Sequence, residues 1–238
     1  REPEEIVDLA KQAYGLTGYE EISLLGLSIS DYYKIKEVLT DLIDIFKKNA
    51  VSISLPSLKP RDNTKDLLAL ITRVRKTGLT LAPEVATSRL HKIINKDFDM
   101  TTFFSTIEYA YRLGYQHIKL YFMIGLPSET KEDLDGILNL SQAASDLKRG
   151  IDIDKRPAKV NISVATFIPK PHTPFQWLGM EDLERIENKQ NYLKSKIKKS
   201  IFDSSVIPEN YKDCMLRQAR AKIKISFHNR YMSFVEGI

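Results

Sequence analysis

Cysteine is almost absent from this sequence, which has only Cys214 among its 238 residues. A single thiol cannot form an internal disulfide, which agrees with a reducing compartment, and it cannot hold a metal cluster alone. His91, His117 and His228 show neither HxH nor HExxH spacing, and none has the His-carboxylate spacing of a metal site. We therefore predict no metal site built from the chain's own residues.

Long apolar runs and several nucleotide-binding motifs are missing as well. The sequence has no run of about 18 apolar residues and no charged-then-apolar leader, so we expect no membrane span, no export signal and a cytoplasmic location. The absence of GxGxxG, the Walker lysine loop and GxSxG argues against a dinucleotide fold, a P-loop nucleotidase and an α/β-hydrolase. The net charge of +5, from 36 basic and 31 acidic residues, permits an RNA partner without requiring one.

Helix and strand patterns alternate along the chain. Short apolar runs predict strands at 21–28, 51–56, 79–83, 117–125 and 160–168, and a strand-like piece at 222–227. Capping and periodicity predict helices at 2–15, 31–48, 64–77, 101–114, 129–148 and 181–200, with Gly15 ending the first and Asp31 capping the second. Hairpins cannot join parallel neighbours, so strands separated by helices predict an α/β fold with mainly parallel strands. Because the chain opens on a helix, we expect one strand to be missing from its front.

In parallel α/β barrels the reactive groups lie at the C-terminal ends of the strands. Those positions hold Gly26, Ser28, Ser54, Pro56, Pro83, Glu84 and the segments 125–127 and 166–172. Glu84 is suited to accept hydrogen bonds from a ribose or an amine, or alternatively to cap the following helix. Gly125 would let a planar ring approach bare backbone, or would serve the turn before Pro127. Lys96 would meet a ligand carboxylate, or remain solvated.

Five segments of the chain together resemble the radical S-adenosylmethionine (SAM) superfamily. These segments are "GYEEISLLGLSISDY", "SISLPSLKPR", "RKTGLTLAPEVATSRLHKIINKD", "IKLYFMIGLPSETKEDLDGI" and "FIPKPHTPFQW". They are most similar to the Fe-S oxidoreductase branch, whose full-length members often carry a cobalamin-binding-type domain ahead of the radical SAM core. The resemblance covers about residues 1 to 180. It implies a partial (β/α)6 TIM-type barrel, with the first strand and the cluster loop missing from this chain.

The resemblance also implies which strand ends contact SAM. Glu84 is similar to the polar residue that binds the methionine or ribose part, and Lys96 to the basic residue that meets the carboxylate. The remaining implied contacts are with the SAM amino group (Gly26, Ser28), with the adenine (Ile124, Gly125), and a further contact on the family's third strand (Ser54). The resemblance names no catalytic residue beyond this cofactor site.

The cluster ligands of the family are the main departure. In the family, three cysteines spaced C-x3-C-x2-C hold a 4Fe-4S cluster, which cleaves SAM reductively to methionine and a 5'-deoxyadenosyl radical. This chain has none of the three, so we expect them upstream of Arg1 and expect the chain alone to be inactive. We predict a partial barrel over 1–203 and a C-terminal extension over 204–238.

Three functions are compatible with these residues. The resemblance implies part of an Fe-S oxidoreductase that takes electrons from a donor and acts on an unidentified substrate, with cobalamin as a candidate further cofactor. The alternatives are a non-catalytic RNA- or protein-binding module on a barrel scaffold, and an unrelated barrel enzyme for phosphorylated small molecules. The last would need phosphate-binding glycines after the final strands, and the sequence has none there.

Overall fold

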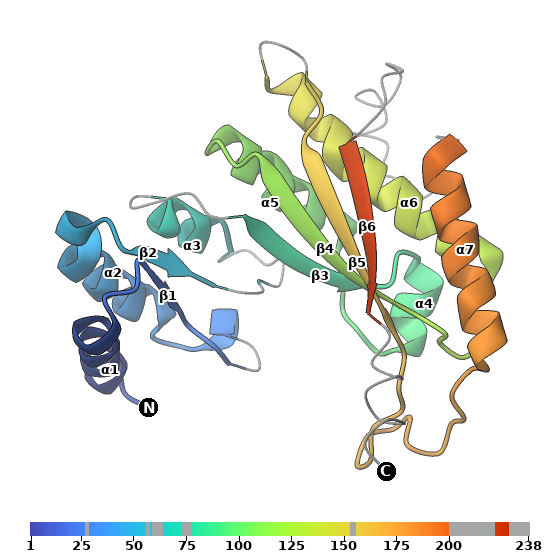
Figure 1. The fold of residues 1–238 in the computed structure, drawn as a ribbon, viewed down its shortest axis with the longest axis horizontal. Coiled ribbons are helices and arrows are strands. Elements are labelled where there is room, and N and C mark those ends of the chain that lie inside the picture. The colour runs from blue at the N-terminus through green and yellow to red at the C-terminus, as the bar shows by residue number, and fades with distance from the viewer. Residues whose placement is uncertain are drawn as a thin grey trace. The chain divides into compact units, whose positions relative to one another are not determined.

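The computed structural model describes residues 1–26, 29–55, 58, 64–72, 78–152, 156–199 and 222–228 (Figure 1). The chain divides into two compact units, which are described separately below. The first unit is Arg1–Leu81 with Thr101–Gln116, and the second is Ala82–Met100 with His117–Ile238. Three residues named above lie outside the described residues: Ser28, Pro56 and Cys214. The expected boundary at 203/204 lies outside them too, so the predicted C-terminal extension stays a prediction.

The first unit contains several helices and a short parallel ladder of two strands. Its elements are α1 (Pro3–Thr17), β1 (Glu21–Ser23), η1 (Ile29–Asp31), α2 (Ile35–Phe46), η2 (Lys47–Asn49), β2 (Ser52–Ser54), α3 (Thr64–Ile71), the start of β3 (Leu79–Glu84) and nearly all of α5 (Met100–Arg112). The apolar face of α2 is buried at helical spacing from Ile35 to Phe46. The Phe46 ring meets the Tyr14 ring of α1 edge-on, with centroids 5.3 Å apart.

The predicted C-terminal end of α1 and the predicted N-terminal end of α2 were both wrong by a few residues. Helix α1 continues past Gly15 and ends at Thr17, followed by the C-cap Gly18, whose φ of 64° lets its N–H donate to Tyr14 O at 2.8 Å. A left-handed C-cap is what glycine favours, so Gly18 and not Gly15 is the stop signal. Asp31 does not cap α2, because it lies in the short turn η1 and Lys34 occupies the N-cap position.

The strands of the first unit are parallel but shorter than predicted. Strands β1 and β2 pair with Ile22 opposite Ile53, and Leu24 N–H adds a bond to Ser54 O at 3.1 Å. Apolar composition predicted runs of eight and six residues, whereas pairing covers three residues in each strand. Within the described residues, β1 and β2 form a sheet of two strands.

The second unit contains a parallel sheet with strand order β3-β4-β5-β6. Its other elements are α4 (Ser88–Ile93), β4 (His117–Ile124), α6 (Lys131–Asp146), η3 (Leu147–Gly150), β5 (Lys159–Thr166), α7 (Leu183–Lys199) and β6 (Lys222–His228). The predicted strands near 117–125, 160–168 and 222–227 are confirmed, whereas α4 was not predicted. The pairings β4–β5 and β5–β6 are parallel, which confirms the α/β fold with parallel strands.

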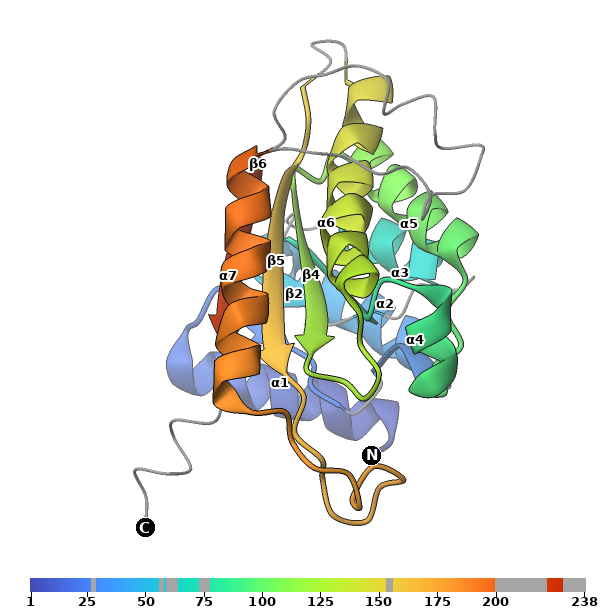
Figure 2. The ribbon, with the colours of Figure 1, turned by 90° about the vertical axis from the view of Figure 1, so that its right-hand side faces the viewer.

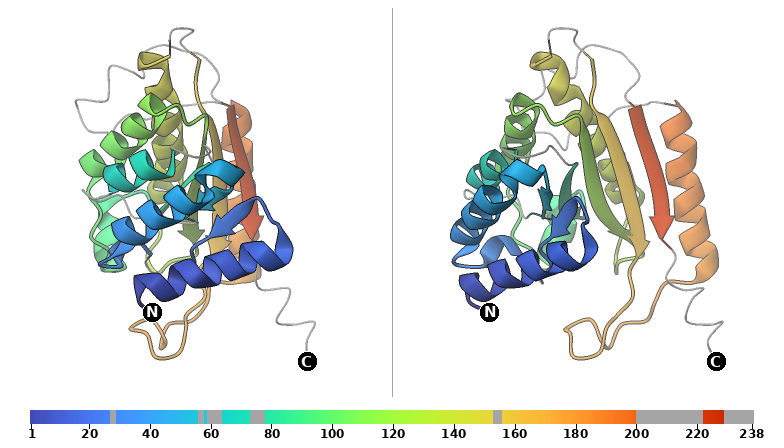
Figure 3. Two further views of the ribbon diagram at one scale, coloured as in Figure 1. Left: turned by 90° about the vertical axis from the view of Figure 1, so that its left-hand side faces the viewer. Right: turned by 60° about the vertical axis from the view of Figure 1, so that its left-hand side comes forward.

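The two faces of this sheet differ in polarity. On β4 the buried residues alternate with half-buried ones, so that Ile118, Leu120, Phe122 and Ile124 share one face. Helices α6 and α7 lie side by side against the sheet (Figure 2) and bury Leu134, Leu140, Ile186 and Leu193, among others. Figure 3 shows β4, β5 and β6 side by side. None of the helices in the described ranges is long and apolar enough to cross a membrane.

Candidate functional site

Glu84 and Lys96 meet at the C-terminal end of β3. Lys96 Nζ lies 3.4 Å from Glu84 Oε1 and donates to Ala82 O at 2.6 Å. Both side chains are partly accessible, 32% for Glu84 and 23% for Lys96. Glu84 has a φ of 71°, a left-handed conformation that is uncommon for a side chain of this size. The strand end therefore presents a carboxylate and an ammonium side by side.

Helix α4 holds Lys96 in this place. Thr87 caps the helix by accepting from Leu90 N–H at 3.4 Å. His91 is buried, its Nε2 lies 3.0 Å from Pro83 O, and its ring stacks on Phe98 with centroids 4.4 Å apart. Burial lowers the pKa of His91, so the ring is neutral near pH 7 and serves as a support for the strand end.

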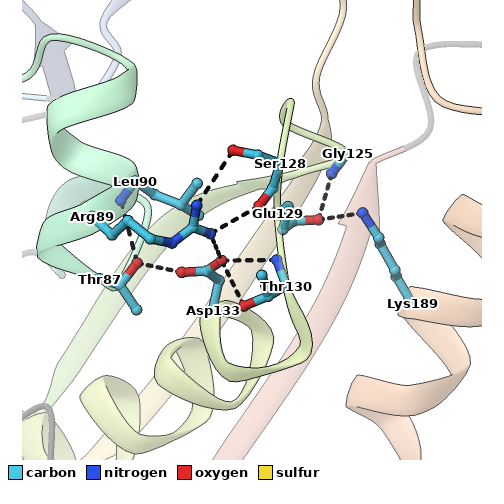
Figure 4. A network of polar contacts seen from close by, with 9 residues as sticks. All are labelled: Thr87, Arg89, Leu90, Gly125, Ser128, Glu129, Thr130, Asp133 and Lys189. Carbon is cyan, nitrogen blue, oxygen red and sulfur yellow. Dashed lines mark hydrogen bonds and ion pairs between the residues drawn. The ribbon is translucent and has the colours of Figure 1, made fainter.

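A network around Asp133 connects α4 to the start of α6 (Figure 4). The Asp133 carboxylate is 3% exposed and accepts hydrogen bonds from Thr87 Oγ1 and Arg89 Nη2. It also accepts from Thr130 N–H at 2.8 Å and Thr130 Oγ1 at 3.0 Å, so it forms part of a capping box. Arg89 further donates to Ser128 O at 2.9 Å. The network fixes α4, and with it the segment that carries Lys96.

The end of β4 is closed by a second polar cluster, formed by Glu129, Lys189 and Glu181. Glu129 accepts from Gly125 N–H at 2.9 Å and from Lys189 Nζ at 2.6 Å (Figure 4). Lys189 also donates to Glu181 at 2.6 Å. The predicted start of the next helix at residue 129 was wrong, because α6 begins at Lys131. Glu129 instead connects β4 to α7.

Glu129 is the most deeply buried charged group of this cluster. Its side chain is 1% exposed, and this burial raises the pKa of Glu129 although Lys189 and the Gly125 amide oppose the change. Burial alone would lower the pKa of Lys189, but its two carboxylate partners raise it. Lys189 is more exposed, at 17%, and has two acceptors, so it stays charged while Glu129 loses more hydration.

Gly125 has a structural requirement of its own. Its φ is +84°, and a Cβ built there would lie 2.6 Å from Ile186 Cδ1 and 3.3 Å from Glu181 Oε2. Helix α7 thus takes up the space beside the glycine, which the backbone turn also requires. The neighbouring Ile124 is fully buried, and its carbonyl accepts from Phe167 N–H at 2.8 Å. The suggested adenine contacts of this pair stay predictions.

Gly125→Ala is expected to lower the free energy of unfolding by about 3 kcal/mol, from the left-handed φ and the overlap with Ile186. Urea unfolding of the chain measures it. Gly15→Ala is the matched control, because Gly15 lies inside α1 with nothing within 4 Å of the added methyl. The control should be neutral or more stable by about 0.5–1 kcal/mol. Equal unfolding midpoints for the two variants would contradict this account of Gly125.

The other predicted contacts lie in the first unit. Gly26 borders an apolar cavity of about 660 Å³ lined by α1, β1, η1 and α2. Ser54 ends β2, and its carbonyl is bonded to Leu24 N–H. Among the described residues there is no group of three or more His, Cys, Asp or Glu side chains that could hold a metal ion.

These features define an α/β protein with parallel strands and paired charges at a strand end. Residues 1–141 match the radical SAM superfamily. This match covers more than half of the 238 residues, so the chain belongs to the radical SAM superfamily. That membership confirms the family predicted from the sequence, and the family implies SAM and a 4Fe-4S cluster.

Curated relatives are longer than this chain. An uncharacterized protein of Methanocaldococcus jannaschii is 31% identical over 200 residues, which cover 84% of this chain and 41% of the relative. The tRNA-2-methylthio-N(6)-dimethylallyladenosine synthase of Desulforamulus reducens is 26% identical over 150 residues, 59% of this chain and 32% of the enzyme. The chain therefore spans less than half the length of these relatives.

A solved structure shares the fold. Coproporphyrinogen III oxidase from Escherichia coli, a radical SAM enzyme, superposes with a TM-score of 0.57 over 85% of this chain and 47% of that one. The sequences are 15% identical, so the likeness concerns the fold alone. It supports the prediction of a TIM-type barrel arrangement for the parallel strands.

Proposed function

We propose that this chain forms the SAM-binding part of a radical SAM Fe-S oxidoreductase. The observation that carries the proposal is the Glu84–Lys96 pair at a strand end, in a chain whose residues 1–141 match the superfamily. SAM ends in an amino acid group with one ammonium and one carboxylate. Glu84 would accept hydrogen bonds from the ammonium or the ribose, and Lys96 would pair with the carboxylate.

The cluster does not fit residues of this chain. Such clusters are held by cysteine thiolates, and the sequence has the single residue Cys214. We propose that the three ligands lie upstream of Arg1 in a longer protein. When bound there, the cluster would supply the electron that cleaves SAM, and the residues described above would bind and orient SAM. Gly26, Ser28, Ser54, Ile124 and Gly125 are proposed as its remaining contacts.

Reconstitution of the longer protein tests this function. After anaerobic treatment with iron and sulfide, it should show cluster absorbance at about 400 nm and form 5'-deoxyadenosine from SAM under dithionite. The 238-residue chain is the matched control, because it carries one cysteine and should neither form the cluster nor cleave SAM. A longer protein that never binds iron under these conditions would overturn the proposal.

RNA is the second candidate partner. The relatives from Desulforamulus reducens and Clostridium botulinum are both named tRNA-2-methylthio-N(6)-dimethylallyladenosine synthase, at 25–26% identity. The net charge of +5 is compatible with a polyanion. A non-catalytic RNA- or protein-binding module differs from the enzyme in one measurable respect, since it would bind its partner but would not cleave SAM. The same reconstitution therefore separates the two functions. It also tests for cobalamin, which would add its own absorbance if an upstream domain of the longer protein carries it.

A further inference from the structure

One face of the sheet in the second unit carries the apolar residues of β4, and the opposite face carries polar residues on β4 and β5. Parallel pairing places Lys119 of β4 beside Asn161 of β5, with Lys224 of β6 as the next register position. One row further along, Tyr121 lies beside Ser163, with Ser226 as the next register position. Residues two apart on a strand share a face, so the two rows form one continuous polar surface. We call these four residues of β4 and β5 the polar sheet face.

Two buried polar atoms on this face have no hydrogen-bond partner among the described residues. They are the Asn161 Oδ1 and the Ser163 Oγ. Ser163 is fully buried, whereas Asn161 is half-buried. A buried acceptor or hydroxyl without a partner costs about 1–3 kcal/mol. A sheet that only had to pack would be more stable with alanine or valine at these positions, so the two groups indicate a ligand that supplies the missing bonds.

The charged group of the same face is the Lys119 ammonium. Lys119 Nζ lies 4.6 Å from the centroid of the Tyr121 ring, and within the described part of the chain no carboxylate forms an ion pair with it. The polar sheet face therefore combines an ammonium donor with a buried amide oxygen and a buried hydroxyl in two neighbouring rows.

We propose that the polar sheet face binds an anionic, hydroxylated small molecule or group, such as a phosphate ester or a polyol carboxylate. Lys119 would pair with the anionic group, Asn161 Oδ1 would accept from a ligand hydroxyl, and Ser163 would donate or accept at the base of the site. Its assignment as the substrate surface rests on the proposed function, because β4 carries Lys119 and Tyr121 of this face and also ends at the proposed SAM contacts Ile124 and Gly125. Binding of the anion itself does not depend on that function.

Calorimetric titration of this chain with ribose 5-phosphate, gluconate and ribose tests the site. At least one of the two anions should bind with a millimolar or lower Kd, and ribose should bind at least tenfold more weakly. The preferred anion identifies the source as a phosphate ester or a carboxylate. Lys119→Met should weaken anion binding about tenfold and Asn161→Ala about fivefold. Lys11→Met, which removes an exposed lysine of α1, should leave Kd unchanged.

Ser163→Ala separates a binding role from a structural one. The variant should weaken anion binding about threefold while its thermal midpoint stays the same or rises, since it removes an unsatisfied hydroxyl. A fall in the midpoint with unchanged Kd would assign Ser163 to structure and overturn its binding role.

The proposal as a whole is overturned if neither anion binds, if ribose binds as tightly as the anions, or if Lys119→Met retains full affinity. Lys119-dependent anion binding in a protein that never cleaves SAM would uphold this site and refute the proposed function. SAM cleavage without such binding would do the reverse.

Discussion

Asp133→Ala is expected to lower the free energy of unfolding by about 3 kcal/mol, the cost of removing one member of a buried charged network. The carboxylate is 3% exposed and accepts from Thr87, Arg89 and both donors of Thr130. Without it, the Thr130 N–H at the start of α6 loses its partner, and α4 loses its connection to α6. Urea unfolding of the chain, followed by circular dichroism, measures the difference.

Asp8→Ala is the matched control for this prediction. Asp8 pairs with Lys11 on the surface of α1 at 3.1 Å, and its side chain is 65% exposed. Exposed pairs of this kind contribute about 0–1 kcal/mol, so the control should change stability little. Similar unfolding midpoints for the two variants would show that the Asp133 network does not stabilise the second unit.

The same comparison should depend on pH. Burial alone would raise the pKa of Asp133, but the hydrogen bonds from Thr87, Thr130 and Arg89 outweigh it and leave the pKa below its ordinary value. A carboxyl whose pKa is lowered on folding stabilises the protein above its unfolded pKa of about 3.9. That contribution is lost as the pH falls through the folded pKa. The difference between the original chain and Asp133→Ala should therefore narrow below about pH 4.

Sequence periodicity predicted the strands that are buried and paired along most of their length. Strands near 117–125 and 160–168 were found because their alternating or continuous apolar residues are what pairing and burial require. In the first unit, the runs 21–28 and 51–56 are equally apolar but pair over three residues each. Pairing depends on which neighbour lies alongside, and a single strand's composition does not contain that information.

In the candidate site, too, residues with a local sequence signal were predicted, and contacts between distant residues were not. Glu84 was named from its place at the end of a strand and Lys96 as an ammonium that could meet a ligand carboxylate, and the structure brings them within 3.4 Å of each other. Glu129 acts through Lys189, 60 residues later, and this partner leaves no local pattern. Asp133 did have a local signal, since the Thr130–Asp133 spacing is that of a capping box. Its bonds to Thr87 and Arg89 come from another helix and could not be read from that spacing.

Glu84→Gln is expected to lower kcat/KM for SAM cleavage about 100-fold in the longer, reconstituted protein. A hydrogen bond to a charged group is worth about 1.5–3 kcal/mol, and the amide keeps the shape of the side chain while removing its charge. The cluster absorbance should not change, because the variant acts on SAM and not on the metal. Glu108→Gln is the matched control, since Glu108 pairs with Arg112 at 2.7 Å on α5 and has no proposed contact with SAM.

Glu84→Gly distinguishes a carboxylate retained for binding from one retained for stability. Glu84 has a φ of 71°, a conformation that glycine adopts without strain, so the variant should unfold within about 1 kcal/mol of the original. Its SAM cleavage should still fall about 100-fold, because the partner of Lys96 and of the SAM ammonium is gone. A left-handed backbone conformation at a charged residue such as Glu84 is typical of functional positions. A Glu84→Gly protein that cleaves SAM at the original rate would show that the carboxylate does not contact the cofactor.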